Sequence, residues 1–125
     1  MENKKWEIEL YEQSNGKVPV LEFILSLPKK MQAKVTRTID LLEEFGISLA
    51  YPHVDSIKGE EYKGMWELRT KLSSNITRIF YFLHDGNKFV LLHGYAKKDA
   101  KTDQKQLKKA KFRMDEYKQR KDDVS

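Results

Sequence analysis

Residues 65–98 read MWELRTKLSSNITRIFYFLHDGNKFVLLHGYAKK, and this stretch decides the fold. It holds three runs rich in β-branched and aromatic residues, separated by polar turn signals at 73–75 and 85–87. Such runs are typical of strands, and the Asp85-Gly86 pair favours a hairpin because both residues tolerate a positive φ. Parallel strands would need a crossover of roughly a dozen residues. The spacing therefore predicts a three-stranded antiparallel meander over 66–72, 76–83 and 89–96.

Each strand of this meander is expected to place a cation or a histidine inside or beside an apolar run, because alternate residues of a strand share a face. On the first strand one face holds Glu67, Arg69 and Lys71. On the second strand Arg78 lies between Ile76 and Phe80. On the third strand one face is expected to hold Leu91, His93, Tyr95 and Lys97. A sheet that only built a core would not need a cation or a histidine in every strand.

The remaining elements follow from periodicity. Alternation over 6–11 predicts a half-buried strand. Helical spacing of apolar residues predicts two helices, over 19–27 and 29–45, with Gly46 in the C-cap position. The stripe of the second helix is formed by Met31, Val35, Ile39, Leu42 and Phe45. The stretch 47–64 is the least regular part of the chain, and His53 is expected in a loop there.

A third helix is expected after the meander. Asp103 is placed to cap it, and it is expected to end near Arg120. Its thin apolar stripe consists of Leu107, Ala110, Met114 and Tyr117. We therefore expect one α+β domain over residues 1–125, made of an N-terminal strand, a helical hairpin, an antiparallel meander and a C-terminal helix.

Composition restricts the class of protein. The chain has 125 residues, of which 34% are charged and 39% hydrophobic, with no cysteine and a net charge of +5. No run approaches the roughly 18 apolar residues of a membrane span, and a cytoplasmic location without membrane association is expected. From Lys97 to Lys121 there are eleven Lys or Arg residues against four acids. This excess favours a polyanion or an acidic partner, although a solvated basic helix would have the same composition.

The common catalytic motifs are absent from the sequence. There is no Gly-rich phosphate loop, no Gly-x-Ser-x-Gly elbow, and no metal-ligand spacing among His53, His84 and His93. Neither a cofactor nor a metal ion is expected. What remains is a set of cationic side chains on the predicted sheet: Arg69, Lys71, Arg78, His93, Lys97 and Lys98.

Such a set suits RNA cleavage without a metal. One group must take the proton of the 2′-hydroxyl, another must stabilise the charged transition state, and a third must protonate the leaving 5′-oxygen. Arginine suits the second task because its planar fork pairs with two phosphate oxygens. His93 is suited to acid or base work near neutral pH. A lysine crowded by other cations has a lowered pKa and can act as a base.

The string WELRTKLSSNITRIFYF, followed by VLLHGYAKK, resembles the RelE/ParE superfamily of bacterial toxins, and within it the phage-derived, HigB-like branch. The resemblance extends from about Trp6 to about Arg113. It implies a RelE-like fold and a toxin of a type II toxin–antitoxin system that cleaves mRNA on the ribosome without a metal. The implied partners are the ribosome, mRNA and a cognate antitoxin, a HigA-like helix-turn-helix protein.

The resemblance also implies roles for individual residues. Arg78 would bind the transition-state phosphate, Arg69 the substrate phosphate, and Lys71 would be a base. His93 or Lys97 would be the proton donor. The residues implied in RNA contact are Lys98, Lys108 and Tyr95, which would stack on a base. The chain lacks the tyrosine that RelE itself carries in a C-terminal tail.

Each assignment has a structural alternative. Arg69 would serve equally in an ion pair with Glu67, and Arg78 in a pair with an acid at the edge of the core. His93 on an apolar strand is also compatible with a buried, fully hydrogen-bonded histidine. Two other functions remain open for the whole chain: a ParE-like inhibitor of DNA gyrase, and a non-catalytic protein that binds RNA or an antitoxin.

Overall fold

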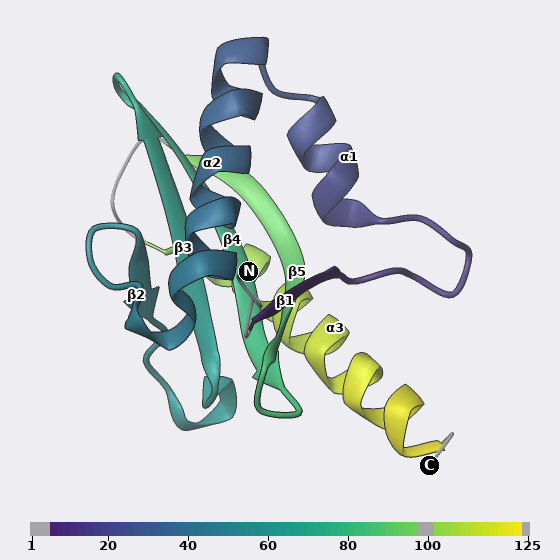
Figure 1. The fold of residues 1–125 in the computed structure, drawn as a ribbon. Helices are drawn as coiled ribbons and strands as arrows, with labels where there is room; N and C mark the ends of the chain where they lie inside the picture. The colour runs from purple at the N-terminus through teal and green to yellow at the C-terminus, as the bar shows by residue number, and fades with distance from the viewer. Residues whose placement is uncertain (1–5, 98–101, 124–125) are drawn as a thin grey trace, which may run out of the picture.

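The computed structural model describes residues 6–97 and 102–123. Its centre is a five-stranded mixed sheet with the strand order β1-β5-β4-β3-β2 (Figure 1). The strands are β1 (Glu7–Leu10), β2 (Val54–Ser56), β3 (Met65–Leu72), β4 (Asn75–His84) and β5 (Lys88–Lys97). β1 pairs with β5 in parallel, and the other neighbours pair antiparallel. The predicted meander and α+β class are confirmed, whereas the short strand β2 was not predicted.

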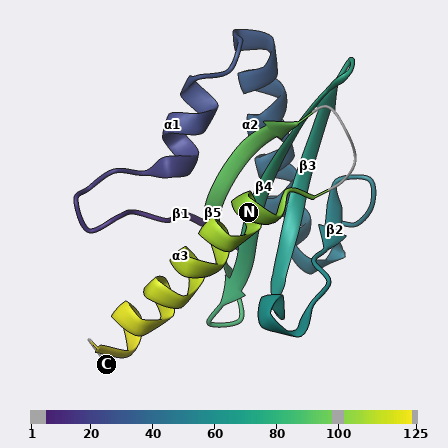
Figure 2. The same cartoon turned by 180° about the vertical axis from the view of Figure 1, so that it is seen from behind.

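Helices cover both faces of the sheet. α1 (Pro19–Leu25) and α2 (Lys29–Phe45) lie on one face, and α3 (Gln104–Asp123) lies on the other (Figures 1 and 2). α2 has the predicted bounds, but α1 ends two residues early, because a residue that precedes proline disfavours the helical region and Pro28 follows Leu27. Two 3₁₀ turns span Gly46–Ser48 and Glu60–Tyr62. None of the helices in the described part of the chain is long and apolar enough to cross a membrane.

Each face of the sheet has its own apolar core. On the α3 face the four residues of the predicted stripe are all buried, at most 2% exposed. On the other face α2 buries Met31, Val35, Thr38 and Leu42. The prediction was wrong for Phe45, which is 46% exposed. Trp6 fills the core at that end instead, so close to Gly46 that an added Cβ would lie 2.0 Å from its ring.

A β-bulge in β5 changes the predicted alternation. Phe80 pairs with His93, but the next residue, Tyr81, pairs with Leu91, so Leu92 is the extra residue. A bulge of this kind breaks the period-two pattern of a strand. Leu91 therefore packs on the α1–α2 face, whereas His93 contacts α3. The prediction that Leu91 shares a face with His93 was wrong for this reason.

The predicted hairpin turn between β4 and β5 is confirmed. Asp85 has φ 56° and Gly86 has φ 80°. Because His84 pairs with Lys88, the loop has three residues, and the first two of them have the positive φ that aspartate and glycine tolerate. The turn thereby sets the register in which β4 meets β5.

Candidate functional site

Cross-strand pairing arranges the candidate residues in three rows on the α3 face of the sheet. One row consists of Glu67, Phe80 and His93. The next consists of Arg69, Arg78 and Tyr95. The last consists of Lys71, Ile76 and Lys97. Side chains directly opposite each other in a sheet are neighbours, so the pairing brings most of the predicted site into one cluster.

Arg78 is buried at the centre of this cluster. Its side chain is 1% exposed and forms an ion pair through Nη1 with Glu67, which is 2% exposed. The Glu67 carboxylate also lies 3.7 Å from Nε of Arg69 and accepts a hydrogen bond from the Thr102 hydroxyl at 3.3 Å. Both arginines therefore lie beside an acid, as the structural alternative in the sequence analysis predicted.

Glu67 is the residue of this cluster that sequence reasoning did not assign. Burial raises its pKa, and the neighbouring Arg78 offsets part of that rise. A carboxylate with a raised pKa is suited to accepting a proton in acid–base catalysis. The sequence did contain a signal for Glu67, because the alternation of side chains along the strand places it on the same face as Arg69 and Lys71.

His93 is held by α3 on both ring nitrogens. Nδ1 lies 2.8 Å from Nη1 of Arg113, and Nε2 contacts Oε1 of Gln106. Because a guanidinium only donates, Nδ1 accepts and Nε2 carries the proton. Burial lowers the pKa of His93, and the charges of Arg113 and Lys109 lower it further. The contact with Gln106 raises the pKa and offsets part of this lowering. His93 is therefore a neutral, hydrogen-bonded histidine at pH 7.

Tyr95 and Lys97 contact the segment that leads into α3. The Tyr95 hydroxyl accepts a hydrogen bond from the backbone N–H of Asp103 at 3.1 Å. Nζ of Lys97 lies 4.0 Å from an Asp103 carboxylate oxygen. Asp103 caps α3 as predicted, since its carboxylate accepts from the backbone N–H of Lys105 at 3.0 Å. Lys98 lies outside the described residues.

The candidate residues thus fall into a covered group and a rim. α3 crosses the sheet face that carries the rows (Figure 2). Arg78, His93 and Tyr95 are buried, at 1%, 9% and 8% exposed. His93 contacts α3 itself, whereas Tyr95 contacts Asp103 just before the helix. Lys71 is exposed, and Arg69 and Lys97 are partly exposed at the rim. Lys108 is exposed on α3 and is not brought to the rows by any contact within the described residues.

The rim opens into a basic cavity beside β3. β2 pairs with β3 only as far as Leu68, and the loop that precedes β2 lies beside β3 at Arg69. The cavity has a volume of about 460 Å³. The polar and aromatic residues in its lining include Lys34, Tyr51, His53, Arg69 and Lys71. The backbone N–H of Arg69 donates to the carbonyl of His53 at 2.7 Å, which fixes the loop against the strand.

This arrangement offers phosphate binding and proton transfer. Arginine and lysine side chains supply positive charge for a phosphate, while Glu67 and the rim lysines supply groups that exchange protons. The described residues contain no cluster of three or more His, Asp or Glu side chains able to hold a metal ion.

One comparison with known proteins gives a match. Residues 22–115 match the model of the family described as phage derived protein Gp49-like (DUF891). The match covers more than half of the chain and includes all the candidate site residues. No curated protein matches the chain.

Proposed function

The chain belongs to the Gp49-like family of phage-derived proteins, a toxin-like family of the RelE type in general, and from this premise we propose that it is a ribosome-dependent endoribonuclease. It is the toxin of a type II toxin–antitoxin system and lies in the HigB-like branch. It cuts mRNA without a metal ion and so inhibits translation in the cytoplasm.

The observation that carries this proposal is the alignment of cations across three strands. Arg69 and Arg78 lie opposite each other. In the next row on the same face, Lys71 and Lys97 lie on either side of Ile76. RNA carries its own nucleophile, the 2′-hydroxyl, so the protein needs only to bind the phosphate and to move two protons. A row of fixed cations suits the charge that develops on the phosphate.

The geometry refines the roles that the sequence suggests. Arg78 and Arg69 bind the phosphate in the transition state and in the substrate, respectively. Lys71 or Glu67 takes the proton of the 2′-hydroxyl. Between His93 and Lys97, the geometry favours Lys97 as the proton donor, because His93 is neutral and both of its ring nitrogens are engaged.

The remaining contacts to RNA come from residues around this centre. Tyr95 stacks on a base, while Lys98 and Lys108 bind the RNA backbone. For RNA to reach Arg78 and Tyr95, the segment around Thr102 and Asp103 must leave Glu67 and Tyr95, its present hydrogen-bond partners. The proposed partners are the ribosome with its mRNA and a HigA-like helix-turn-helix antitoxin that blocks the basic face.

The test maps mRNA ends by primer extension in a translation extract. The unmodified chain is expected to produce cuts within translated codons. Lys71→Gln is expected to lower the cleavage rate about a hundredfold, the contribution of a group that transfers a proton, and Arg69→Gln to lower it by a similar factor through loss of a charged phosphate contact. Lys63→Gln, an exposed lysine on a distant turn, is the matched control and should cleave normally.

These variants avoid a difficulty with Arg78→Ala, which would leave Glu67 buried without its main partner. Thermal unfolding of each variant shows whether the fold persists. If the unmodified chain makes no cuts, or if the Arg69 and Lys71 variants cut as well as the control, the endoribonuclease proposal is wrong.

One observation favours a second function. Arg78 and His93 are buried and have partners within the protein, as expected for structural residues. A non-catalytic protein that binds RNA or an antitoxin through the rim would have this arrangement. In the same extract it would bind without producing new mRNA ends.

A further inference from the structure

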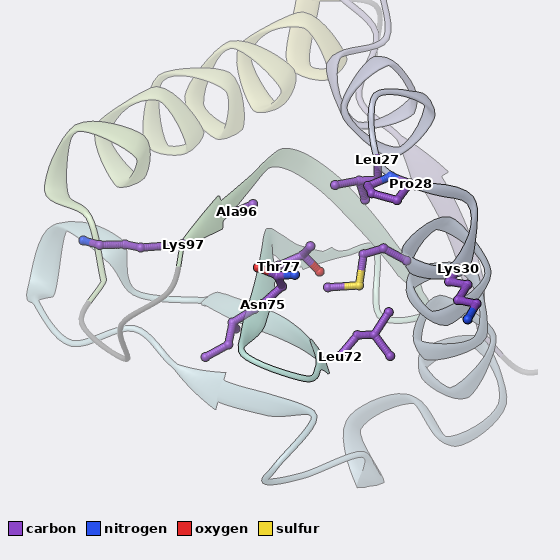
Figure 3. A pocket seen from close by; sticks show the side chains of 10 residues that line it. Leu27, Pro28, Lys30, Leu72, Asn75, Thr77, Ala96 and Lys97 are labelled. Carbon is purple, nitrogen blue, oxygen red and sulfur yellow. The ribbon is translucent and has the colours of Figure 1, made fainter.

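A second cavity lies at the end of the sheet, between the turn joining α1 to α2 and the turn joining β3 to β4. Its volume is about 550 Å³. The lining is mostly apolar and includes Leu27, Pro28, Met31, Leu72, Ile76 and Ala96. In Figure 3, Thr77 lies in the middle of the cavity, with Lys30 and Lys97 on opposite sides. The charged ends of both lysines point away, so only their alkyl stems face the apolar space (Figure 3).

Thr77 gives this cavity a buried polar group, in addition to the Asn75 amide and the two lysines of its lining. The Thr77 side chain is 1% exposed, and its hydroxyl has no hydrogen-bond partner among residues 6–97 and 102–123. Buried hydroxyls nearly always have a partner, and leaving one unpaired is unfavourable. Because threonine changes between staggered rotamers, a ligand that reaches the floor of the cavity can bond to this hydroxyl.

The apolar cavity adjoins the basic cavity beside β3. Ile76 lines both of them. Among the described residues, the two linings contain five lysines or arginines and one histidine but no aspartate or glutamate. Tyr51, in the lining of the basic cavity, is 76% exposed. An exposed aromatic ring beside cations is the usual arrangement for binding single-stranded nucleic acid.

We propose that the two cavities form one site for single-stranded RNA, in which the apolar cavity takes an unstacked nucleobase and the basic cavity takes the adjoining phosphates. The base contacts the apolar walls with its ring and the Thr77 hydroxyl with its polar edge. Lys34 and Arg69, which both line the basic cavity, bind the phosphates, and Tyr51 stacks on the next base. This site rests on the proposed function and adds a base-selecting pocket to it.

A nucleobase fits this cavity better than an apolar side chain from a protein partner. A leucine or methionine would satisfy the walls but would leave the Thr77 hydroxyl unpaired. A base has both a flat apolar face and hydrogen-bonding atoms at its edge. The cations around the rim suit the phosphates that accompany a base. A nucleotide therefore matches the apolar walls, the Thr77 hydroxyl and the cations together.

The experiment measures binding of short fluorescein-labelled RNAs by anisotropy, without ribosomes, so that no cleavage is needed. The probes are oligoadenylate and oligouridylate, each compared with the same strand carrying one abasic position. Thr77→Val, which keeps the shape and removes the hydroxyl, should weaken binding about fivefold through loss of one hydrogen bond. Ala96→Phe, which fills the cavity, should weaken it about tenfold through loss of the base contacts.

The matched controls are on the exposed side of α2. Thr36→Val and Ala33→Phe make the same chemical changes away from both cavities and should bind RNA normally. Thermal unfolding checks each variant, and Thr77→Val should be at least as stable as the unmodified chain, because it removes an unpaired buried hydroxyl. If Ala96→Phe does not fold, Thr77→Val alone decides.

The proposal is overturned if no RNA binds, if the abasic strands bind as tightly as the intact ones, or if the cavity variants bind like their controls. A polyglutamate peptide is added as a competitor of the RNA. If the peptide displaces the RNA and the remaining binding does not depend on the bases, the surface belongs to an acidic protein partner and the proposal is wrong. Base-dependent binding without cleavage in the extract would uphold this site and overturn the endoribonuclease proposal, so the two failures can be distinguished.

Discussion

Arg69 and Arg78 lie directly opposite each other on β3 and β4, and Glu67 contacts both guanidinium groups. Like charges directly opposite each other in a sheet are destabilising, so the buried carboxylate is what allows two arginines to share this face. The contact has a structural role in the free protein.

The buried pair leads to a prediction about stability. Arg78→Met should lower the free energy of unfolding by about 3–5 kcal/mol, because it leaves the Glu67 charge buried with a weaker partner. The double variant Glu67→Leu with Arg78→Met should regain most of that loss, because no buried charge is left without its partner. Urea unfolding of the two single variants and the double variant measures the coupling. Additive losses would contradict the prediction.

His93 leads to a prediction about pH. Burial lowers its pKa in the folded state, below the value of about 6.5 of an unfolded chain. The stabilisation linked to its neutral form is therefore complete above pH 6.5 and is lost as the pH falls from there through the folded pKa. The groups that face it are Gln106, Lys109 and Arg113.

Melting temperatures measured across this pH range test the assignment. His93→Gln should remove this part of the pH dependence, whereas His53→Gln, in the loop beside β3, should leave it in place. A loss of stability on acidification that is the same in the His93 variant would show that another group is responsible.

At the scale of elements, α3 decides which candidate residues meet solvent. It packs four apolar side chains on the sheet, and Arg113 adds two polar contacts, to the carbonyl of Leu92 at 3.0 Å and to Nδ1 of His93 at 2.8 Å. Several of its other cations are engaged at the same face. Lys118 lies 5.3 Å from the centre of the Phe82 ring, and Lys121 lies 5.3 Å from that of Tyr117. Much of the basic character of α3 therefore serves packing.

Arg113→Met should loosen α3 without removing the apolar stem of the side chain. Amide hydrogen exchange in α3 is expected to accelerate at least tenfold, because both polar contacts of Arg113 are lost, each worth roughly a kcal/mol. Exchange in α1 and α2, on the other face, should stay unchanged. Lys111→Met, which removes only the exposed pair with Asp115, is the control. Uniform acceleration along the whole chain would instead indicate global destabilisation.

At the scale of the whole molecule, the positive charge of α3 and the apolar cavity are separate features. The net charge is +5, and exposed lysines of α3 contribute to it on one side. The two cavities lie at the end of the sheet near the tip of the helical hairpin. Charge attracts any polyanion, whereas the cavity acts only on an unstacked base.

Replacing Lys105, Lys108 and Lys109 together by Gln should therefore weaken RNA binding and reduce its salt dependence. If all three contact phosphates, the slope of log K against log salt should fall by about 2 for a single strand. The discrimination against abasic strands should be unchanged. The triple variant Lys17→Gln, Lys58→Gln and Lys63→Gln has the same net charge and is the control. Loss of base discrimination in the α3 variant would contradict the separation.

Local patterns in the sequence determined the elements of this protein. The meander, the bounds of α2, the apolar stripe of α3, its Asp103 cap and the Asp85-Gly86 turn all follow from spacing within one segment, because periodicity and turn chemistry are properties of neighbouring residues. The sequence identified Arg69, Lys71, Arg78, His93 and Lys97 as candidate residues on the three strands, and the strand register places them on one face.

Only the tertiary structure decided what those residues meet. The pairing of Arg78 with Glu67, the bulge at Leu92, the cover that α3 places over His93, and the cavity that leaves Thr77 without a partner all depend on strand register and on which helix crosses which face. These relations join residues that are distant in the chain, and no periodicity within a single segment carries them.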